Sequence, residues 1–133
     1  MTNITEDYVS FEIAKLLKEK GFDEPCECLY DTENNDVSIV NGWMNTSNSE
    51  LEEREFVCYS APTIQMAMKW LREEKDVQIE IPIVGKDTWE SPTKWIYGFR
   101  CQTKDVIDRR NADFSSYEEA CEAAIKYCLE NLI

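Results

Sequence analysis

Two cysteines separated by a single residue, Cys26 and Cys28, are the clearest candidates for chemistry in this sequence. They lie in the stretch EPCECLYD, residues 24–31, which also holds three carboxylates. A pair of thiols can bind a metal ion or form a redox-active disulfide. If this stretch is a β-strand, both side chains point to one face and their Cα atoms lie about 6.6 Å apart. That separation is near the upper limit for a disulfide, and side chains that point the same way are poorly aimed for one.

A thiolate metal site would need more ligands than this pair supplies. Cys58 and Cys101 are cysteines that a sheet could bring beside the pair, but the sequence has no CxxC spacing of the kind typical of zinc sites. Tyr30 continues the face of the two cysteines, whereas Glu27 and Asp31 lie on the opposite face. We therefore interpret the stretch as a strand with cysteines inside and acids outside. A metal site and a redox pair are the alternatives.

The absence of histidine restricts the possible chemistry most. None of the 133 residues is a histidine, which excludes Ser-His and Cys-His nucleophile pairs and removes the commonest nitrogen ligand of zinc, iron and copper. The four glycines form no glycine-rich phosphate loop. We therefore predict a protein that is not an enzyme and assign it no catalytic residue, no cofactor-binding residue and no cofactor.

Acidic charge is concentrated in the first half of the chain. The net charge is −13; residues 1–60 hold 14 acidic and 4 basic residues, whereas residues 61–133 hold 13 and 10. Because affinity for nucleic acids comes largely from Lys and Arg contacts to phosphates, we expect no direct binding of DNA or RNA. The excess acid either keeps the protein soluble or imitates a nucleic acid and occupies a DNA-binding protein.

The sequence carries no targeting or membrane signal. No apolar run approaches the roughly 20 residues of a membrane span, and the N-terminal stretch MTNITEDYVS lacks the basic and apolar regions of a signal peptide. We expect a cytoplasmic protein without membrane contact, in which the six cysteines remain thiols.

Four apolar side chains are candidates for contact with a protein partner. Trp43 and Trp89 lie in polar stretches, where a tryptophan can anchor a partner or cover the edge of the core. Met66 and Trp70 lie four residues apart on an expected helix, displaced from its main apolar stripe. This second pair either widens the contact with the core or meets a partner.

Three segments have the periodicity and the end signals of helices. Ser10 is a suitable N-cap for the first helix, and Gly21 supplies the left-handed residue at its C-terminal end. Pro62 is expected in the first turn of the second helix, and the third opens on a capping box in SSYEE. The expected helices are SFEIAKLLKEKGF, the segment that follows APT, and SSYEEACEAAIKYCLENLI.

Alternating apolar residues predict strands between these helices. The strand VQIEIPIV is expected at an edge or bulged near Pro82, because proline cannot donate a ladder hydrogen bond. CECLYD and VSIV are expected to form a hairpin. The expected strands are residues 26–31, 37–40, 54–60, 77–84 and 94–102.

The order α-β-β-β-α-β-β-α predicts the fold class. We expect one α+β domain over residues 1–133, with a mostly antiparallel sheet of about five strands and three helices packed on one face. The polar stretches 41–53 and 85–93 are expected to be mobile loops.

At YVSFEIAKLLKEKGFDEPC, APTIQMAMKWLRE and FSSYEEACEAAIKYCLENLI, the chain resembles a group of small proteins from prophages and other mobile elements of gut bacteria. The resemblance covers both ends and the middle helix, and it excludes 41–53 and 85–93. It implies a cytoplasmic accessory protein of mobile DNA and assigns no catalytic residue.

Three hypotheses about function follow. The favoured one is a non-enzymatic protein that acts through a protein partner or through self-association. The second is a DNA mimic that inhibits a DNA-binding host protein, based on the acidic first half of the chain. The third is a thiol or metal protein that uses Cys26 and Cys28.

Overall fold

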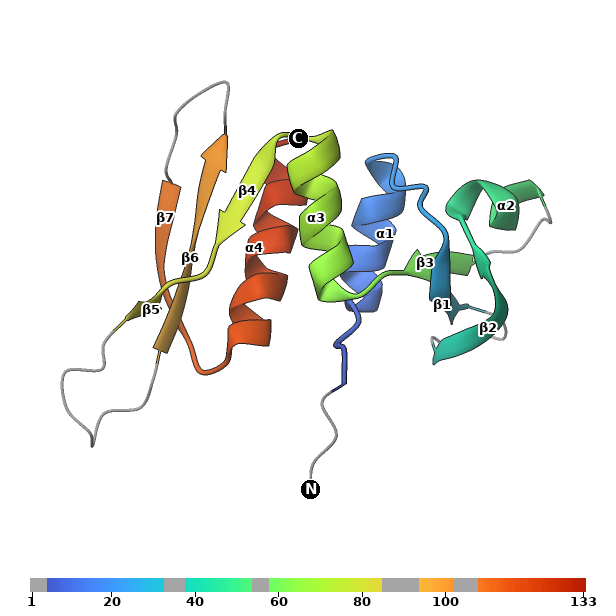
Figure 1. The fold of residues 1–133 in the computed structure, drawn as a ribbon, viewed down its shortest axis with the longest axis horizontal. Coiled ribbons are helices and arrows are strands. Elements are labelled where there is room, and N and C mark those ends of the chain that lie inside the picture. Colours follow the sequence, from blue (N-terminus) through green and yellow to red (C-terminus); the bar gives the residue numbers. More distant parts are fainter. Residues whose placement is uncertain (1–4, 33–37, 54–57, 85–93, 102–107) are drawn as a thin grey trace. The chain divides into compact units, whose positions relative to one another are not determined.

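The fold is α+β, with two separate antiparallel sheets (Figure 1). A computed structural model describes residues 5–32, 38–53, 58–84, 94–101 and 108–133. The chain divides into two compact units, residues 1–66 and 67–133. The elements of the described residues are α1 (Phe11–Glu19), β1 (Cys26–Asp31), β2 (Ser38–Thr46), α2 (Asn48–Glu53), β3 (Cys58–Ala61), α3 (Ile64–Glu74), β4 (Val77–Glu80), β5 (Ile83–Val84), β6 (Lys94–Cys101), β7 (Asp108–Phe114) and α4 (Tyr117–Asn131).

The first unit is built on the three-stranded sheet β2-β1-β3. β1 pairs antiparallel with both neighbours, so the predicted hairpin is confirmed. The ring of Phe11 on α1 meets Tyr30 and Tyr59 edge-on, at 5.6 and 5.5 Å between ring centroids. These two tyrosines are opposite each other in the β1–β3 ladder. α1 therefore packs on the sheet through aromatic contacts, which are stronger than their buried area alone would give.

The ends of α1 follow the sequence signals. The Ser10 hydroxyl accepts a hydrogen bond from the Ile13 N–H at 3.4 Å. Gly21 has a φ of +94°, and the Phe22 N–H donates to the Leu17 carbonyl at 2.9 Å. This is the left-handed helix ending that the sequence predicted, and it satisfies a carbonyl that the helix itself leaves unpaired.

The prediction of a loop at 41–53 is wrong. β2 continues to Thr46 and α2 follows it. Asn48 is buried; its side chain donates to the Phe22 carbonyl at 2.8 Å and accepts from the Ser60 N–H at 2.9 Å. Asp23 accepts from both the backbone and the hydroxyl of Ser49, at 2.7 and 2.5 Å. The polar composition that indicated a loop therefore serves buried and capping hydrogen bonds.

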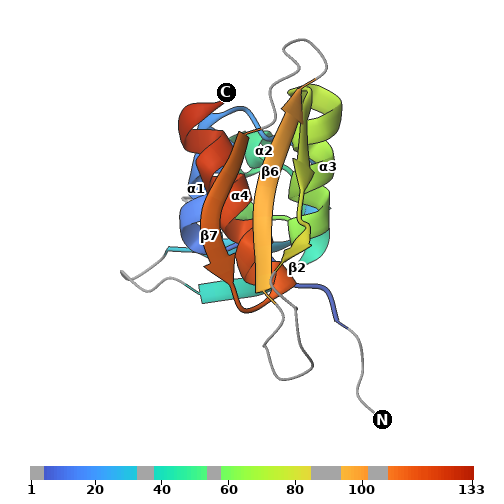
Figure 2. The same cartoon turned by 90° about the vertical axis from the view of Figure 1, so that its left-hand side faces the viewer.

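The second unit is a four-stranded sheet with α4 on one face. β6 pairs with β4 and β5 along one side and with β7 along the other. Figure 2 shows β6 and β7 face-on, with α4 behind them. Phe99 stacks on Tyr127 of α4 at 5.4 Å, and Val77 and Ile79 are buried. The expected edge position is confirmed, because β4 and β5 each pair with β6 alone among the described strands. The expected single strand is divided in two, since β4 ends at Glu80 and β5 begins at Ile83.

The starts of the later helices confirm one prediction and correct another. The Ser116 hydroxyl accepts from the Glu119 N–H at 3.1 Å and caps α4 as expected. Pro62 lies before α3 rather than in its first turn. The Thr63 hydroxyl accepts from the Met66 N–H at 3.1 Å and makes the cap there. The proline still suits its position, because a helix does not need the N–H of the residue before its cap.

The prediction of a single sheet of about five strands is also wrong. The described strands form one sheet of three and one of four, and the described helices number four rather than three. β7 was missed because DRRNADF is too polar to signal a strand. The prediction of one domain, made from length, stays a prediction, because two compact units can fold cooperatively. Within the described ranges, every helix is too short or too polar to span a bilayer.

Candidate functional site

A surface pocket of about 200 Å³ in the first unit collects two residues singled out in the sequence, Cys26 and Met66. We call it the Met66 pocket. Its walls are largely apolar, and Glu27 supplies the one carboxylate among its lining residues. The lining residues are Tyr8, Pro25, Cys26, Glu27, Asn45, Ala61, Pro62, Thr63 and Met66.

The backbone around the Met66 pocket is fixed by pairing between distant segments. The residues before α1 lie antiparallel to those before α3, with a bridge between Tyr8 and Thr63. The Val9 N–H donates to the Pro62 carbonyl at 3.0 Å, and the Ile64 N–H donates to the Asp7 carbonyl at 2.8 Å. These bonds hold Tyr8 and Pro62, two walls of the pocket, in place.

The β1–β2 ladder is irregular at the same pocket. Cys26 is opposite Thr46, whereas Cys28 is opposite Asn41, so β2 advances five positions where β1 advances two. Asn45, one of the extra residues, lines the pocket and is exposed. Bulges of this kind redirect side chains and often lie beside binding sites.

Cys26 is a buried thiol and not a reactive one. It is 5% exposed, and its Sγ donates to the Glu24 carbonyl at 3.4 Å. Burial raises the pKa of Cys26 to about 12, and the charges of Glu24 and Cys28 add to that effect. The thiol is therefore protonated at neutral pH, which disfavours it as a nucleophile or metal ligand.

Other described side chains do not extend the cysteine pair into a metal site. Cys58 is opposite Asp31 in the β1–β3 ladder, five residues from Cys26 along β1, or about 16 Å at the strand rise. Two zinc–sulfur bonds of about 2.3 Å cannot span that distance. Within the described ranges, no group of three or more Cys, Asp or Glu side chains is placed to hold a metal ion.

Alkylation measures the burial of Cys26 directly. At pH 8 we expect iodoacetamide to modify Cys26 in the native protein at least about tenfold more slowly than in the urea-unfolded chain, because both access and the thiolate fraction are reduced. Mass spectrometry of the peptide with isotope-coded reagents gives both rates for the same residue. Equal rates would contradict a buried, protonated thiol.

Acidic side chains surround the Met66 pocket. A side-chain hydrogen bond joins Tyr8 and Cys28 and is the largest cause of a raised Tyr8 pKa; the Cys28 charge, burial, Glu27 and Glu6 raise it further. Glu24 acts in the same way on the pKa of Cys26 in the pocket wall. Glu6, Glu24 and Glu27 are all exposed. The pocket therefore combines apolar walls with a negative surrounding potential.

The four apolar candidates for partner contact differ in their exposure. Met66 is 41% exposed, whereas Trp70 on the same helix is 7% exposed and has the Lys75 ammonium 5.4 Å from its ring centroid. Trp70 therefore exposes little side-chain surface that a partner could contact. Trp43 was expected in a loop, but its backbone belongs to β2; its side chain lies outside the described residues, as does the whole of Trp89 and the segment 85–93.

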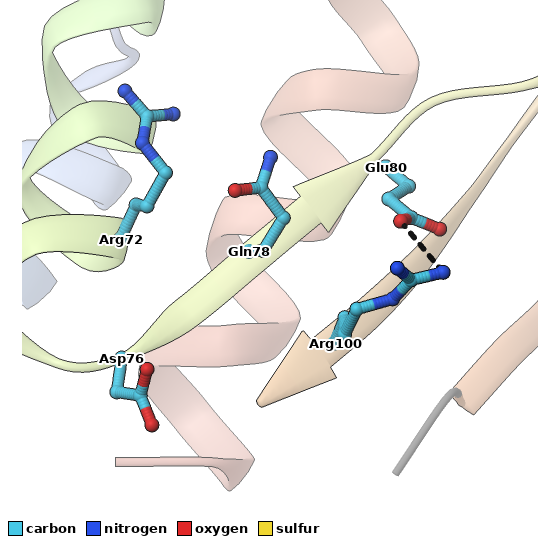
Figure 3. A pocket seen from close by; sticks show the side chains of 5 residues that line it. All are labelled: Arg72, Asp76, Gln78, Glu80 and Arg100. Carbon is cyan, nitrogen blue, oxygen red and sulfur yellow. Dashed lines mark ion pairs between the residues drawn. The ribbon is translucent and has the colours of Figure 1, made fainter. Parts of the chain in front are cut away.

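A second, polar pocket of about 290 Å³ lies within the second unit (Figure 3). Arg72 comes from α3, Gln78 and Glu80 from β4, Arg100 from β6, and Asp76 from the turn between α3 and β4. Sequence reasoning missed this pocket, because its five residues read as ordinary surface polar residues. One signal in the sequence could have pointed to the pocket. Asp76 occupies the position just after α3 at which a helix commonly has a glycine.

No family model, curated protein or solved structure matches the chain.

Proposed function

We propose that this protein is a non-enzymatic accessory protein that acts by binding a basic protein partner, and that the Met66 pocket receives a Lys or Arg side chain of that partner. The observation that carries the proposal is the combination of exposed apolar side chains at Pro25 and Met66 with the carboxylate of Glu27. Lys and Arg bury their aliphatic stems against apolar surface and keep the charged end among polar groups.

The volume and charge of the pocket both fit this occupant. About 200 Å³ is below the usual range for drug-sized ligands, and it suits a single long side chain. Glu6, Glu24 and Glu27 around it are exposed and would meet a guanidinium or ammonium group with charge-assisted hydrogen bonds. The strongly acidic first half of the chain would also draw a basic partner from a distance.

Charge also separates the favoured partner from the alternatives. A second copy carries the same −13 charge and would be repelled, which favours a distinct partner over self-association. A DNA mimic needs acids in phosphate-like rows, but Lys18 pairs with Glu52 at 3.4 Å and so neutralises one of them. The DNA-mimic proposal is therefore less favoured. A cytoplasmic role beside mobile DNA remains in keeping with the resemblance found at the helices.

Short fluorescent peptides that differ only in a central Arg, Lys, Gln or norleucine would test the proposal by anisotropy. We expect the Arg and Lys peptides to bind at least about tenfold more tightly than the other two, because each gains a charge-assisted hydrogen bond. Glu27→Gln should remove most of the preference for Arg and Lys, and Met66→Ser should weaken the binding of all four peptides. Higher salt should weaken the Arg and Lys peptides most.

Glu19→Gln provides the matched control. It removes the same charge from an exposed position on α1 that does not line the pocket. If Glu19→Gln weakened the Arg peptide as much as Glu27→Gln did, binding would follow net charge and not the pocket. Equal affinity for the Arg and norleucine peptides would contradict recognition of a basic side chain.

A further inference from the structure

The polar pocket of the second unit lies on the face of the sheet opposite α4. Gln78 and Arg100 are cross-strand partners in the β4–β6 ladder, and their side chains are exposed. Val77 and Ile79, which alternate with the pocket residues along β4, are buried. Figure 3 shows Gln78 and Glu80 on β4 and Arg100 on β6 with α4 behind them, whereas Arg72 stands on α3 and Asp76 lies at the start of β4. The pocket is therefore open to solvent on a rigid support of paired strands.

Asp76 has two unusual properties. Its φ is +57°, in the left-handed region that glycine, asparagine and aspartate tolerate best. Its Oδ2 atom is buried and has no hydrogen-bond partner among the described residues. A buried carboxylate oxygen without a donor is unfavourable. Gly21 fills the corresponding left-handed position after α1, so an aspartate here is not needed to end the helix.

The two arginines of the pocket are held only weakly. Arg100 Nη2 lies 3.4 Å from Glu80 Oε1, and Arg72 Nε lies 3.8 Å from Glu73 Oε1. The arginine side chains are 58% and 43% exposed. Solvent-exposed ion pairs of this kind contribute little. Either guanidinium can therefore turn to a ligand carboxylate, which it would bind through two parallel hydrogen bonds.

The charges of the pocket are balanced. Arg72 and Arg100 oppose Asp76 and Glu80, with the neutral amide of Gln78 between them. A purely anionic ligand would face two carboxylates, and a purely cationic ligand would face two guanidiniums. A ligand with one charge of each sign meets both sets favourably. A volume of about 290 Å³ lies at the lower end of ligand pockets, which favours a small molecule.

We propose that this pocket binds a small zwitterion of the α-amino acid class. The ligand ammonium contacts the Asp76 carboxylate, which lines the pocket. The ligand carboxylate accepts from Arg72 or Arg100, and the Gln78 amide contacts its backbone or side-chain polar atoms. This site depends on residues of the second unit alone and is independent of the proposed partner site.

Chemical-shift titrations of the isotope-labelled full chain with single free L-amino acids would test the site. We expect at least one of them to shift the amide signals of residues 76–80 and Arg100 saturably below about 10 mM. The N-acetyl derivative, which lacks the ammonium, and the amide derivative, which lacks the carboxylate, should each bind at least about tenfold more weakly. Asp76→Asn and Arg72→Gln should each weaken the binding of the free amino acid by a similar factor.

Two further variants separate binding from folding. Asp76→Gly accepts the positive φ without strain and should keep or raise the melting temperature while losing the ligand. Glu118→Gln, at an exposed position on α4 outside the pocket, should leave affinity unchanged. Unchanged affinity in a folded Asp76→Gly variant, equal binding of the N-acetyl derivative, or no saturable shift with any free amino acid would overturn the proposal.

Discussion

Asn48→Ala is expected to lower the free energy of unfolding by about 3 kcal/mol, since it leaves two buried backbone groups without partners. The Asn48 side chain is 4% exposed and joins the Phe22 carbonyl to the Ser60 N–H. Both of those residues are buried as well, so water cannot replace the lost bonds without opening the structure. Urea denaturation followed by circular dichroism would measure the change.

Two controls make the Asn48 test specific. Asn48→Asp keeps the acceptor but turns the donor that faces the Phe22 carbonyl into a second acceptor, so we expect a comparable loss. Ser49→Ala removes an exposed hydroxyl that donates to Asp23 and should cost no more than about 1 kcal/mol. If Asn48→Ala cost no more than Ser49→Ala, the amide would not be the buried link that joins α2 to the residues after α1.

Phe99→Ala is expected to cost about 3–5 kcal/mol, as large-to-small substitutions of buried aromatics do. The ring is 1% exposed. It meets Tyr97 at 5.5 Å and stacks on Tyr127 of α4 at 5.4 Å, and its cross-strand partner Ile79 is buried. The substitution therefore removes the contact between the centre of the second sheet and its covering helix.

Hydrogen exchange resolved by peptide would show where the protection is lost. We expect the largest losses in β4, β6 and α4, the elements that surround Phe99. Phe99→Leu, which conserves most of the volume, should cost less than about 1.5 kcal/mol. A loss below about 1 kcal/mol for Phe99→Ala would show that this ring does not organise the sheet–helix contact.

The two proposed sites were inferred from different observations, and each proposal can be contradicted without affecting the other. The Met66 pocket contains two residues that the sequence singled out, and its proposed occupant follows from the acidic first half of the chain. The sequence analysis did not predict the polar pocket, because Arg72 and Arg100 are 28 residues apart in the chain. A negative result with basic peptides leaves the amino acid titration unaffected.

The cysteines show how far a local pattern can be followed. Alternation along β1 correctly placed Cys26 inside and Glu27 outside. It did not predict that Cys28 would be half-buried and hydrogen-bonded to the side chain of Tyr8, which lies twenty residues earlier in the chain. Nor did it predict that Cys26 would line a surface pocket. Those outcomes depend on the pairing of Tyr8 with Thr63, which is a contact between distant segments.

The sequence by itself determined the α+β class and the helix ends of α1 and α4, because capping side chains and left-handed residues act on their own helix. It also determined the β1–β2 hairpin and the edge position of the strand near Pro82, which depend on alternation and on a missing N–H. Only the tertiary structure decided the division into two sheets, the formation of α2 and β7, and the convergence of Asp76 with two arginines. Strand pairing and side-chain convergence join residues far apart in the chain, and their free energy depends on partners that no local pattern contains.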